Sequence, residues 1–198
     1  MPLRLRRPSL RSVVIGAALV EAGLLLGLVL YLAISGKALL ISLVPRERVP
    51  AAGPSPRLIV PVAGVRVADL KDSYGAARSG GRKHKGVDIM APKGTPVVAA
   101  AAGVIVGRDS GGLGGIALYE RDLDGRTVYY YAHLQGYRGG LAVGDLVRQG
   151  DVIGYVGATG NAGGTPHLHF AAFTVTEPNR WRKGKDLNPY PLLIGPDP

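Results

Sequence analysis

Thr165-Pro166-His167-Leu168-His169-Phe170 is the stretch of this 198-residue chain that decides its predicted fold. Successive residues of a β-strand point to opposite faces, so His167 and His169 should share one face and Leu168 and Phe170 the other. We therefore expect a strand whose apolar side chains enter a core while two imidazoles project from the opposite face.

Segments on the N-terminal side of this stretch have the same character and predict an all-β domain. Short apolar or alternating runs are separated by turns that contain Gly or Asp. Together with the strand above, these runs are Val97–Val106, Ile116–Glu120, Thr127–His133, Val152–Val156 and His167–Thr176. Residues 122–125, Asp-Leu-Asp-Gly, should close a hairpin. Because no amphipathic helix longer than two turns is evident in this region, the predicted fold is an antiparallel β-sheet or sandwich.

The composition agrees with this fold and limits the possible chemistry. The chain holds 30 Gly and 15 Pro without a collagen-like period, and aromatic residues reach only 6%, which favours a turn-rich β domain. There is no cysteine, which excludes a disulfide scaffold, a thiol nucleophile and a cysteine-ligated metal. Any bound metal must therefore be held by histidine and carboxylate.

The net charge of +10 does not indicate a nucleic-acid-binding protein. The excess divides evenly between residues 1–50 and 51–198, and no basic run interleaved with aromatic residues is present. Without a basic face of that kind, nucleic acid is not expected as a partner.

The N-terminal residues predict a membrane anchor. A basic segment, 1–11, precedes an apolar segment, 12–34, whose only charged residue is Glu21. As a helix the apolar run would be about 33 Å long, enough to cross a hydrocarbon core of about 30 Å. Its many Leu, Ile and Val residues outweigh the cost of about 2.5–3.5 kcal/mol for one central acid. The positive-inside rule then places 1–11 in the cytoplasm and everything after Ile34 outside.

A cleaved signal peptide is the alternative for this segment, since Ala33-Ile34-Ser35 resembles a weak cleavage site. The apolar run is longer than the roughly 7–15 residues of a signal-peptide core, which favours an uncleaved signal anchor. In both cases the rest of the chain is exported. Residues 35–56 contain several prolines and predict a linker, and residues 57–198 should form the folded domain.

The histidines suggest a metal site. The chain has only four, and they are His84, His133, His167 and His169. His84 and Asp88 would lie about 13 Å apart on a straight strand, but a bend at Gly86 would bring them together. This pair and one histidine of the H-x-H strand would supply three ligands and leave a fourth tetrahedral position for water, as in a catalytic zinc site. The two remaining histidines would then be available for proton transfer.

A series of short motifs runs through residues 72–176. The motifs are Ser73-Tyr74-Gly75, His84-Lys85-Gly86-Val87-Asp88, Gly94-Thr95-Pro96-Val97, Gly103-Val104-Ile105, Tyr131-Ala132-His133-Leu134, Gly144-Asp145, Gly157-Ala158-Thr159-Gly160-Asn161 and His167-Leu168-His169-Phe170. From about Asp72 to Phe173 this series resembles, in the same order, the motifs of the lysostaphin/LytM-type zinc metallopeptidases.

This resemblance implies a β-sheet core with a substrate groove, one zinc ion per chain, and endopeptidase activity on the peptide part of peptidoglycan. It implies that His84, Asp88 and His169 bind zinc and that His133 and His167 are catalytic, without dividing the proton-transfer roles between the last two. Stem or bridge peptides of peptidoglycan are the expected partners. Together with the anchor, the resemblance predicts a single-pass protein of the inner (cytoplasmic) membrane whose C-terminal domain faces the periplasm or cell wall.

Two other functions remain open beside the endopeptidase. One is a catalytically inactive relative that binds peptidoglycan and activates a separate cell-wall amidase, although such relatives usually lose metal ligands. The other is a plain peptidoglycan-binding module, which would not need all four histidines. The glycine-rich run Gly111-Gly112-Leu113-Gly114-Gly115 is expected to be a mobile loop that borders the groove.

Overall fold

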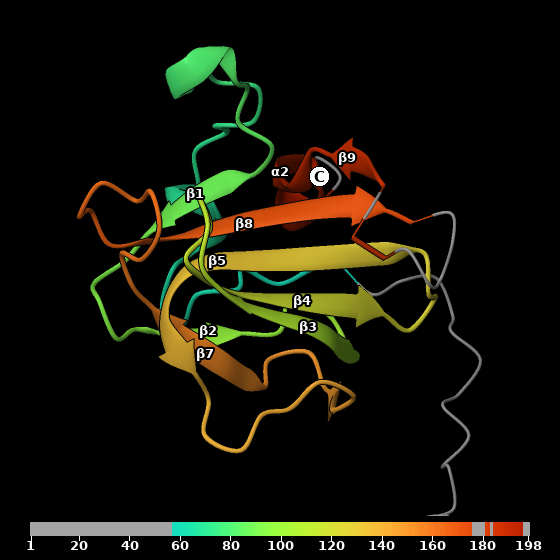
Figure 1. The fold of residues 1–198 in the computed structure, drawn as a ribbon. Helices are drawn as coiled ribbons and strands as arrows, with labels where there is room; N and C mark the ends of the chain where they lie inside the picture. Colours follow the sequence, from blue (N-terminus) through green and yellow to red (C-terminus); the bar gives the residue numbers. More distant parts are fainter. Residues whose placement is uncertain (1–56, 176–180, 183, 196–198) are drawn as a thin grey trace, which may run out of the picture. The chain divides into compact units, whose positions relative to one another are not determined.

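A computed structural model describes residues 57–175, 181–182 and 184–195 of the chain (Figure 1). In this part of the chain the dominant elements are short antiparallel strands. The strands are β1 (Val87–Met90), β2 (Pro96–Val98), β3 (Gly103–Ser110), β4 (Ile116–Asp122), β5 (Thr127–Tyr137), β6 (Leu146–Val147), β7 (Val152–Val156), β8 (His167–Thr174) and β9 (Lys185–Leu187). The helical elements are the 3-10 turns η1 (Val67–Asp69) and η2 (Ser79–Gly81) and the short helix α2 (Pro189–Ile194). The predicted all-β fold is confirmed.

All nine strands belong to one antiparallel hydrogen-bonded network. Its main path runs β1-β8-β5-β4-β3-β6, while β9 pairs with β8, and β7 pairs with both β2 and β5. β5 makes this branching possible because its first part lies between β8 and β4 and its last residues turn away to pair with β7 (Figure 1). The sequence allowed either a single sheet or a sandwich, and the strands form one continuous sheet.

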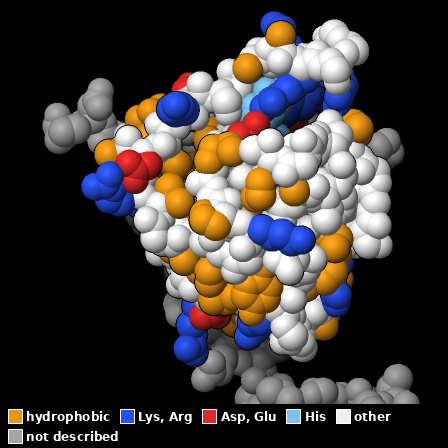
Figure 2. Space-filling view, turned by 90° about the vertical axis from the view of Figure 1, so that its left-hand side faces the viewer, with side chains coloured by type: hydrophobic (Ala, Val, Ile, Leu, Met, Phe, Trp, Pro, Cys, Tyr) orange, Lys and Arg blue, Asp and Glu red, His pale blue; other side chains and the backbone are white. Residues whose placement is uncertain are grey.

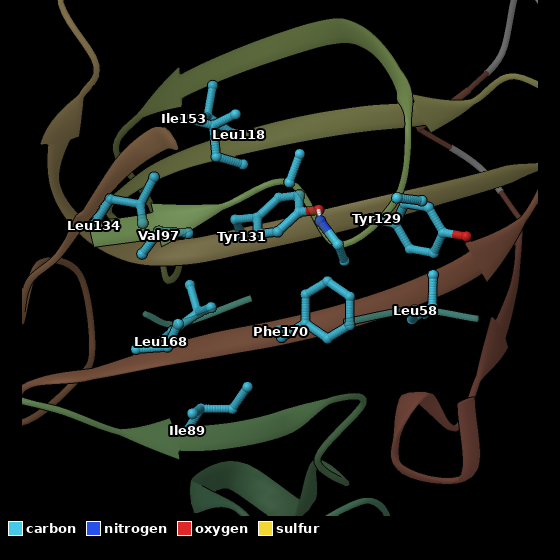
Figure 3. Packing of buried hydrophobic residues seen from close by; sticks show 14 of the residues in the cluster. Leu58, Ile89, Val97, Leu118, Tyr129, Tyr131, Leu134, Ile153, Leu168 and Phe170 are labelled. Carbon is cyan, nitrogen blue, oxygen red and sulfur yellow. Dashed lines mark hydrogen bonds between the residues drawn. The ribbon is translucent and has the colours of Figure 1, made fainter. Parts of the chain in front are cut away.

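The core lies against one face of this sheet, where alternation along the strands places the apolar side chains. Leu168 and Phe170 on β8 pack beside Ile89 on β1 and Tyr131 on β5, and each of the four is at most 2% exposed (Figure 3). Burying a side chain of this size contributes about 1.5–3 kcal/mol. The alternation predicted for Leu168 and Phe170 is confirmed, and it leaves His167 and His169 on the opposite face.

The predicted strand Val97–Val106 is wrong in one respect, because the structure divides it into β2 and β3. Between them Ala99, Ala100 and Ala101 are almost fully buried beneath the sheet. The Ala100 amide donates to the Tyr131 hydroxyl across 2.9 Å instead of joining a strand ladder. The hairpin predicted at residues 122–125 is present between β4 and β5.

The predictions for residues 1–56 concern a part of the chain that the structure does not describe. The basic segment 1–11, the predicted membrane helix 12–34 and the linker 35–56 all lie outside the described residues. Among the residues that are described, none of the helices has the length and apolar character needed to cross a membrane.

Candidate metal centre and catalytic histidines

Three adjacent strands place the site on the sheet face opposite the core. Asp88 on β1 lies directly across from His169 on β8, and His169 lies across from Ala132 on β5. Side chains that face each other across antiparallel strands have Cβ atoms about 4.5–5.5 Å apart, which is close enough to share an ion. The register of these strands therefore brings together residues that are far apart in the sequence.

The ligand atoms of His84, Asp88 and His169 converge on one point. His84 Nε2 lies 2.8 Å from His169 Nδ1 and 3.0 Å from Asp88 Oδ1, and His169 Nδ1 lies 3.1 Å from the same oxygen. A tetrahedral zinc ion with bonds of about 2.0 Å separates its donor atoms by about 3.3 Å. This triangle of two nitrogens and one oxygen therefore fits zinc with little adjustment, and the described residues hold it ready for a metal.

Ser73 holds two of these three residues in place. Its carbonyl accepts a hydrogen bond from His84 Nδ1 across 2.8 Å, and its hydroxyl accepts one from the Asp88 amide across 3.1 Å. Because a carbonyl can only accept, His84 Nδ1 carries the proton and Nε2 presents its lone pair to the site. The sequence motif that begins at Ser73 pointed to this region, but it did not reveal the contact.

Gly86 lies at a bend of the chain, as the sequence suggested, and it is also needed for space. Its φ angle is not in the left-handed region, so another residue could adopt its backbone conformation. A Cβ atom there would, however, lie 2.5 Å from the Phe170 carbonyl oxygen and 2.9 Å from Cε1 of His169. Glycine thus allows the chain next to β1 to lie directly against the imidazole of a candidate ligand.

Asp88 has a second partner that the sequence did not indicate. Its Oδ2 atom accepts a hydrogen bond from the Arg78 guanidinium, while Oδ1 faces His84 and His169. Burial alone would raise the pKa of Asp88, but its contacts with His169, His84 and Arg78 outweigh burial and hold this pKa well below its usual range. The carboxylate is therefore charged and correctly turned for a cation.

His133 reaches the site through a β-bulge. Ile116 pairs with Leu134, and Leu118 pairs with Tyr131. Between these two pairs β4 has one residue, Ala117, whereas β5 has two, Ala132 and His133. His133 has a φ angle of 62° and is the only non-glycine residue in the described ranges with a positive φ. Such a conformation costs about 1–3 kcal/mol and is concentrated at functional sites. The extra residue lets consecutive side chains face the same side, so both Ala132 and His133 line the site.

His133 and His167 lie side by side and present the same ring atom. Their ring centroids are 4.8 Å apart. His133 Nδ1 donates to the Thr159 carbonyl across 2.9 Å, and His167 Nδ1 donates to the Thr165 carbonyl across 2.8 Å. In the neutral form of each ring Nε2 therefore carries no proton and can accept one.

Burial favours the neutral form of His133 and of His169. It lowers the pKa of His133 to about 4 and also lowers the pKa of His169, and the neighbouring imidazoles act in the same direction on both. A neutral ring is the form that binds a metal or accepts a proton. The electrostatics of both residues thus agree with the orientation of their rings.

Two glycine-rich loops interlock beside His133. A Cβ atom on Gly115 would lie 2.4 Å from the Gly160 amide nitrogen, and one on Gly160 would lie 2.3 Å from the Leu113 carbonyl oxygen. The Leu113 carbonyl also accepts a hydrogen bond from the Asn161 amide. The loop expected at residues 111–115 does border the site, and these contacts tie it to the loop that holds His133.

All five predicted site residues line one cleft of about 420 Å³. We call it the cleft, and its other lining residues include Arg78, Arg82, Lys83, Lys85, Leu113, Gly114, Tyr130 and Asn161. Figure 2 shows histidine surface, in pale blue, bordered by Lys and Arg side chains. A metal triangle, two proton acceptors and space for a ligand are therefore present in the same place, an arrangement suited to metal-assisted hydrolysis.

Several known proteins resemble this chain in sequence and in fold. The family model described as peptidase family M23 matches residues 82–189. The L-Ala--D-Glu endopeptidase of Bacillus subtilis is 36% identical over 131 residues, which are 62% of this chain and 39% of that protein. The peptidoglycan DD-endopeptidase ShyC of Vibrio cholerae is 38% identical over 89 residues, which are 45% of this chain and 20% of that protein.

A solved structure is also similar to this chain in fold and in sequence. The catalytic domain of the antimicrobial peptidase lysostaphin from Staphylococcus simulans matches with a TM-score of 0.56 and 32% identity, covering 65% of this chain and 96% of that domain. The two curated relatives are matched over 39% and 20% of their lengths, so this chain resembles only part of each. Because the family model spans more than half of the chain and includes all five site residues, the chain belongs to peptidase family M23.

Proposed function

We propose that this chain is a zinc-dependent endopeptidase that hydrolyses peptide bonds in peptidoglycan. The observation that carries the proposal is the triangle of His84 Nε2, Asp88 Oδ1 and His169 Nδ1 beside two histidines whose Nδ1 atoms are held by backbone carbonyls. The names of the Bacillus and Vibrio relatives describe endopeptidases, and the Vibrio name specifies peptidoglycan. Both kinds of support point to the same chemistry.

The site residues divide the work as follows. When bound, zinc lowers the pKa of a coordinated water to about 7 and polarises the scissile carbonyl. His84, Asp88 and His169 would hold the ion, and Arg78 and Ser73 fix the orientation of two of them. One of His133 and His167 accepts the proton of the attacking water through Nε2. The other donates a hydrogen bond to the oxyanion or a proton to the leaving amine.

The decisive experiment uses purified full-length protein and peptidoglycan fragments. We expect hydrolysis of a peptide bond that stops when a chelator removes the metal and returns when zinc is added, with products identified by mass spectrometry. Binding of the fragments without hydrolysis by zinc-loaded protein would instead support the inactive relative that activates an amidase. No hydrolysis and no binding would contradict a role on peptidoglycan altogether.

The proposed substrate lies outside the cytoplasm, so the domain must be exported. We propose that residues 12–34 anchor the protein in the cytoplasmic membrane and that residues 57–198 face the periplasm or cell wall. The support is the arginine-rich segment before the apolar run. A reporter that is active only outside the cytoplasm, fused after Pro198, should be active. Replacing the arginines of residues 1–11 with neutral residues should reduce this activity, whereas a cytoplasmic signal from the wild-type fusion would contradict the anchor.

A further inference from the structure

Cationic side chains gather on one side of the cleft. Four of its lining residues are cations from a single stretch of chain, and they are Arg78, Arg82, Lys83 and Lys85. Within the described residues, Asp88 is the only carboxylate that lines the cleft. The fold thus concentrates part of the positive charge of the domain beside the site.

A small hairpin produces this concentration. Ala77 forms a bridge with Lys83, and the Arg78 amide donates to the Arg82 carbonyl across 2.8 Å. The turn between the two bridged segments contains η2, where Gly80 and Gly81 have left-handed φ angles of 73° and 69°. In Figure 1 this segment, drawn in green, projects beyond β1. The hairpin thus carries its basic side chains out along the edge of the cleft.

Two of the four cations already have acidic partners and two do not. Arg78 binds Asp88, and Lys85 Nζ lies 2.7 Å from Asp186 Oδ2. Among the described residues, Arg82 and Lys83 form no ion pair. Arg82 donates only to the carbonyl and the hydroxyl of Ser79, across 3.1 Å and 3.3 Å, and both acceptors are neutral. These bonds orient the guanidinium and leave its charge uncompensated.

The rest of the cleft offers no competing charge of this kind. The two glycine-rich loops contribute Leu113, Gly114, Asn161 and Ala162, which are uncharged. Apart from the proposed metal centre, a bound peptide would therefore meet positive charge on the hairpin side. A carboxylate is the peptide group that best matches a guanidinium and an ammonium, through charge-assisted hydrogen bonds.

We propose that Arg82 and Lys83 form a subsite for a substrate carboxylate, so that the enzyme prefers peptides with free carboxylates near the scissile bond over neutral peptides. This inference rests on the proposed function and names the substrate class of the same site. A charge on the rim of a cleft acts on encounter and on orientation, and added salt screens it.

The test compares two forms of the same peptidoglycan fragments, one with free carboxylates and one with its carboxylates converted to amides. The zinc-loaded full-length protein should have a higher kcat/KM on the acidic form, and salt should reduce the difference. Each exposed charge pair is expected to change kcat/KM by about 1.5- to 5-fold. The double variant Arg82→Gln/Lys83→Gln should lose this preference while keeping its zinc content. Lys93→Gln removes an exposed cation outside the cleft and serves as the control.

The outcomes separate the subsite from the proposed function. Equal kcat/KM on both forms, or a preference that survives in the double variant, overturns the subsite and leaves the endopeptidase intact. Failure to hydrolyse either form contradicts the proposed function. In that case the affinities of the two fragments, measured by calorimetry, decide the subsite, and equal affinities overturn it.

Discussion

Asp88 uses its two carboxylate oxygens for different partners. Oδ1 faces the nitrogens of His84 and His169, while Oδ2 is held by Arg78. A carboxylate held in this way can offer only one oxygen to a metal, and it cannot rotate to offer the other. Residues that hydrogen-bond to a metal ligand in this way fix its orientation, and their loss commonly lowers metal affinity by about 10–100-fold.

The first prediction concerns the three candidate ligands. His84→Ala, Asp88→Ala and His169→Ala should each abolish stoichiometric zinc, because two remaining ligands hold the ion poorly. Elemental analysis of the purified variants measures this directly, and circular dichroism checks that the sheet is retained. Stoichiometric zinc in one of the variants would exclude that residue as a ligand.

The second prediction concerns Arg78. Arg78→Ala should weaken zinc binding about 10–100-fold, because Asp88 loses the contact that orients it. Competition with a chromogenic chelator gives the affinity without any measurement of activity. Arg82→Ala is the matched control, since in the described structure its guanidinium contacts Ser79 and not a ligand. Equal zinc affinity in Arg78→Ala and the wild type would mean that the ion pair of Arg78 with Asp88 does not contribute to metal binding.

The third prediction separates catalysis from metal binding. His133→Ala and His167→Ala should keep zinc, because neither ring belongs to the triangle of ligand atoms. Each should lower kcat by about 10²–10⁴-fold, the usual contribution of a positioned proton-transfer group. The double variant should lose much less than the product of the single losses, because the two rings act together. If His167→Ala loses zinc while His169→Ala retains it, the two roles on β8 are exchanged.

At the scale of elements, the sequence predicted the regular parts of the site and the bend at Gly86, but it missed the bulge at His133. Alternation placed His167 and His169 on one face of β8 correctly, because a strand has a fixed period of two. The bulge at His133 breaks that period and depends on the partner strand β4, so it has no local signal. The contacts of Arg78 and Ser73 likewise depend on the packing of distant segments. The assignment of ligands and catalytic residues came from the family's motifs, and the structure shows that these residues meet.

The fourth prediction concerns the close approach at Gly86. Gly86→Ala should reduce both zinc affinity and the free energy of unfolding, because its methyl group would push against Phe170 and His169. A loss of about 1–3 kcal/mol is expected from overpacking of this kind. Gly139→Ala is the matched control, since a Cβ atom there meets nothing within 4 Å and its φ angle is not positive. If both variants bind zinc like the wild type, the proposed reason for glycine at residue 86 is wrong.

At the scale of the whole molecule, the core contains an acid that the site does not use. Glu120 on β4 is fully buried, and its Oε2 atom accepts a hydrogen bond of 2.6 Å from the Tyr131 hydroxyl. Oε1 has no hydrogen-bond partner in the described structure. Burial raises the pKa of Glu120 to about 8, and the nearby charge of Asp122 acts in the same direction, while the bond from Tyr131 opposes them. The folded protein therefore keeps a proton that the unfolded chain releases at much lower pH.

The fifth prediction is that Glu120 makes the domain less stable as the pH rises. The pKa is about 4.5 in the unfolded chain and about 8 in the folded protein, so the folded state binds more protons between these values. The contribution of Glu120 to stability is fully present below about pH 4.5 and is lost progressively as the pH rises to about 8, by up to several kcal/mol at 1.36 kcal/mol per unit. Urea unfolding of the full-length protein, with a chelator present to exclude metal effects, measures this dependence.

Glu120→Gln tests the assignment because glutamine cannot ionise but keeps a carbonyl that can accept the Tyr131 hydrogen bond. The difference in unfolding free energy between this variant and the wild type should grow in favour of the variant from about pH 5 to about pH 8. Asp124→Asn, at an exposed acid in the turn after β4, is the control and should show a much flatter difference. Removing the charge abolishes the cost of burying it, so the pH-dependent part of the difference belongs to residue 120 alone. A difference that stays constant across this range would mean that Glu120 ionises in the folded core as readily as in water.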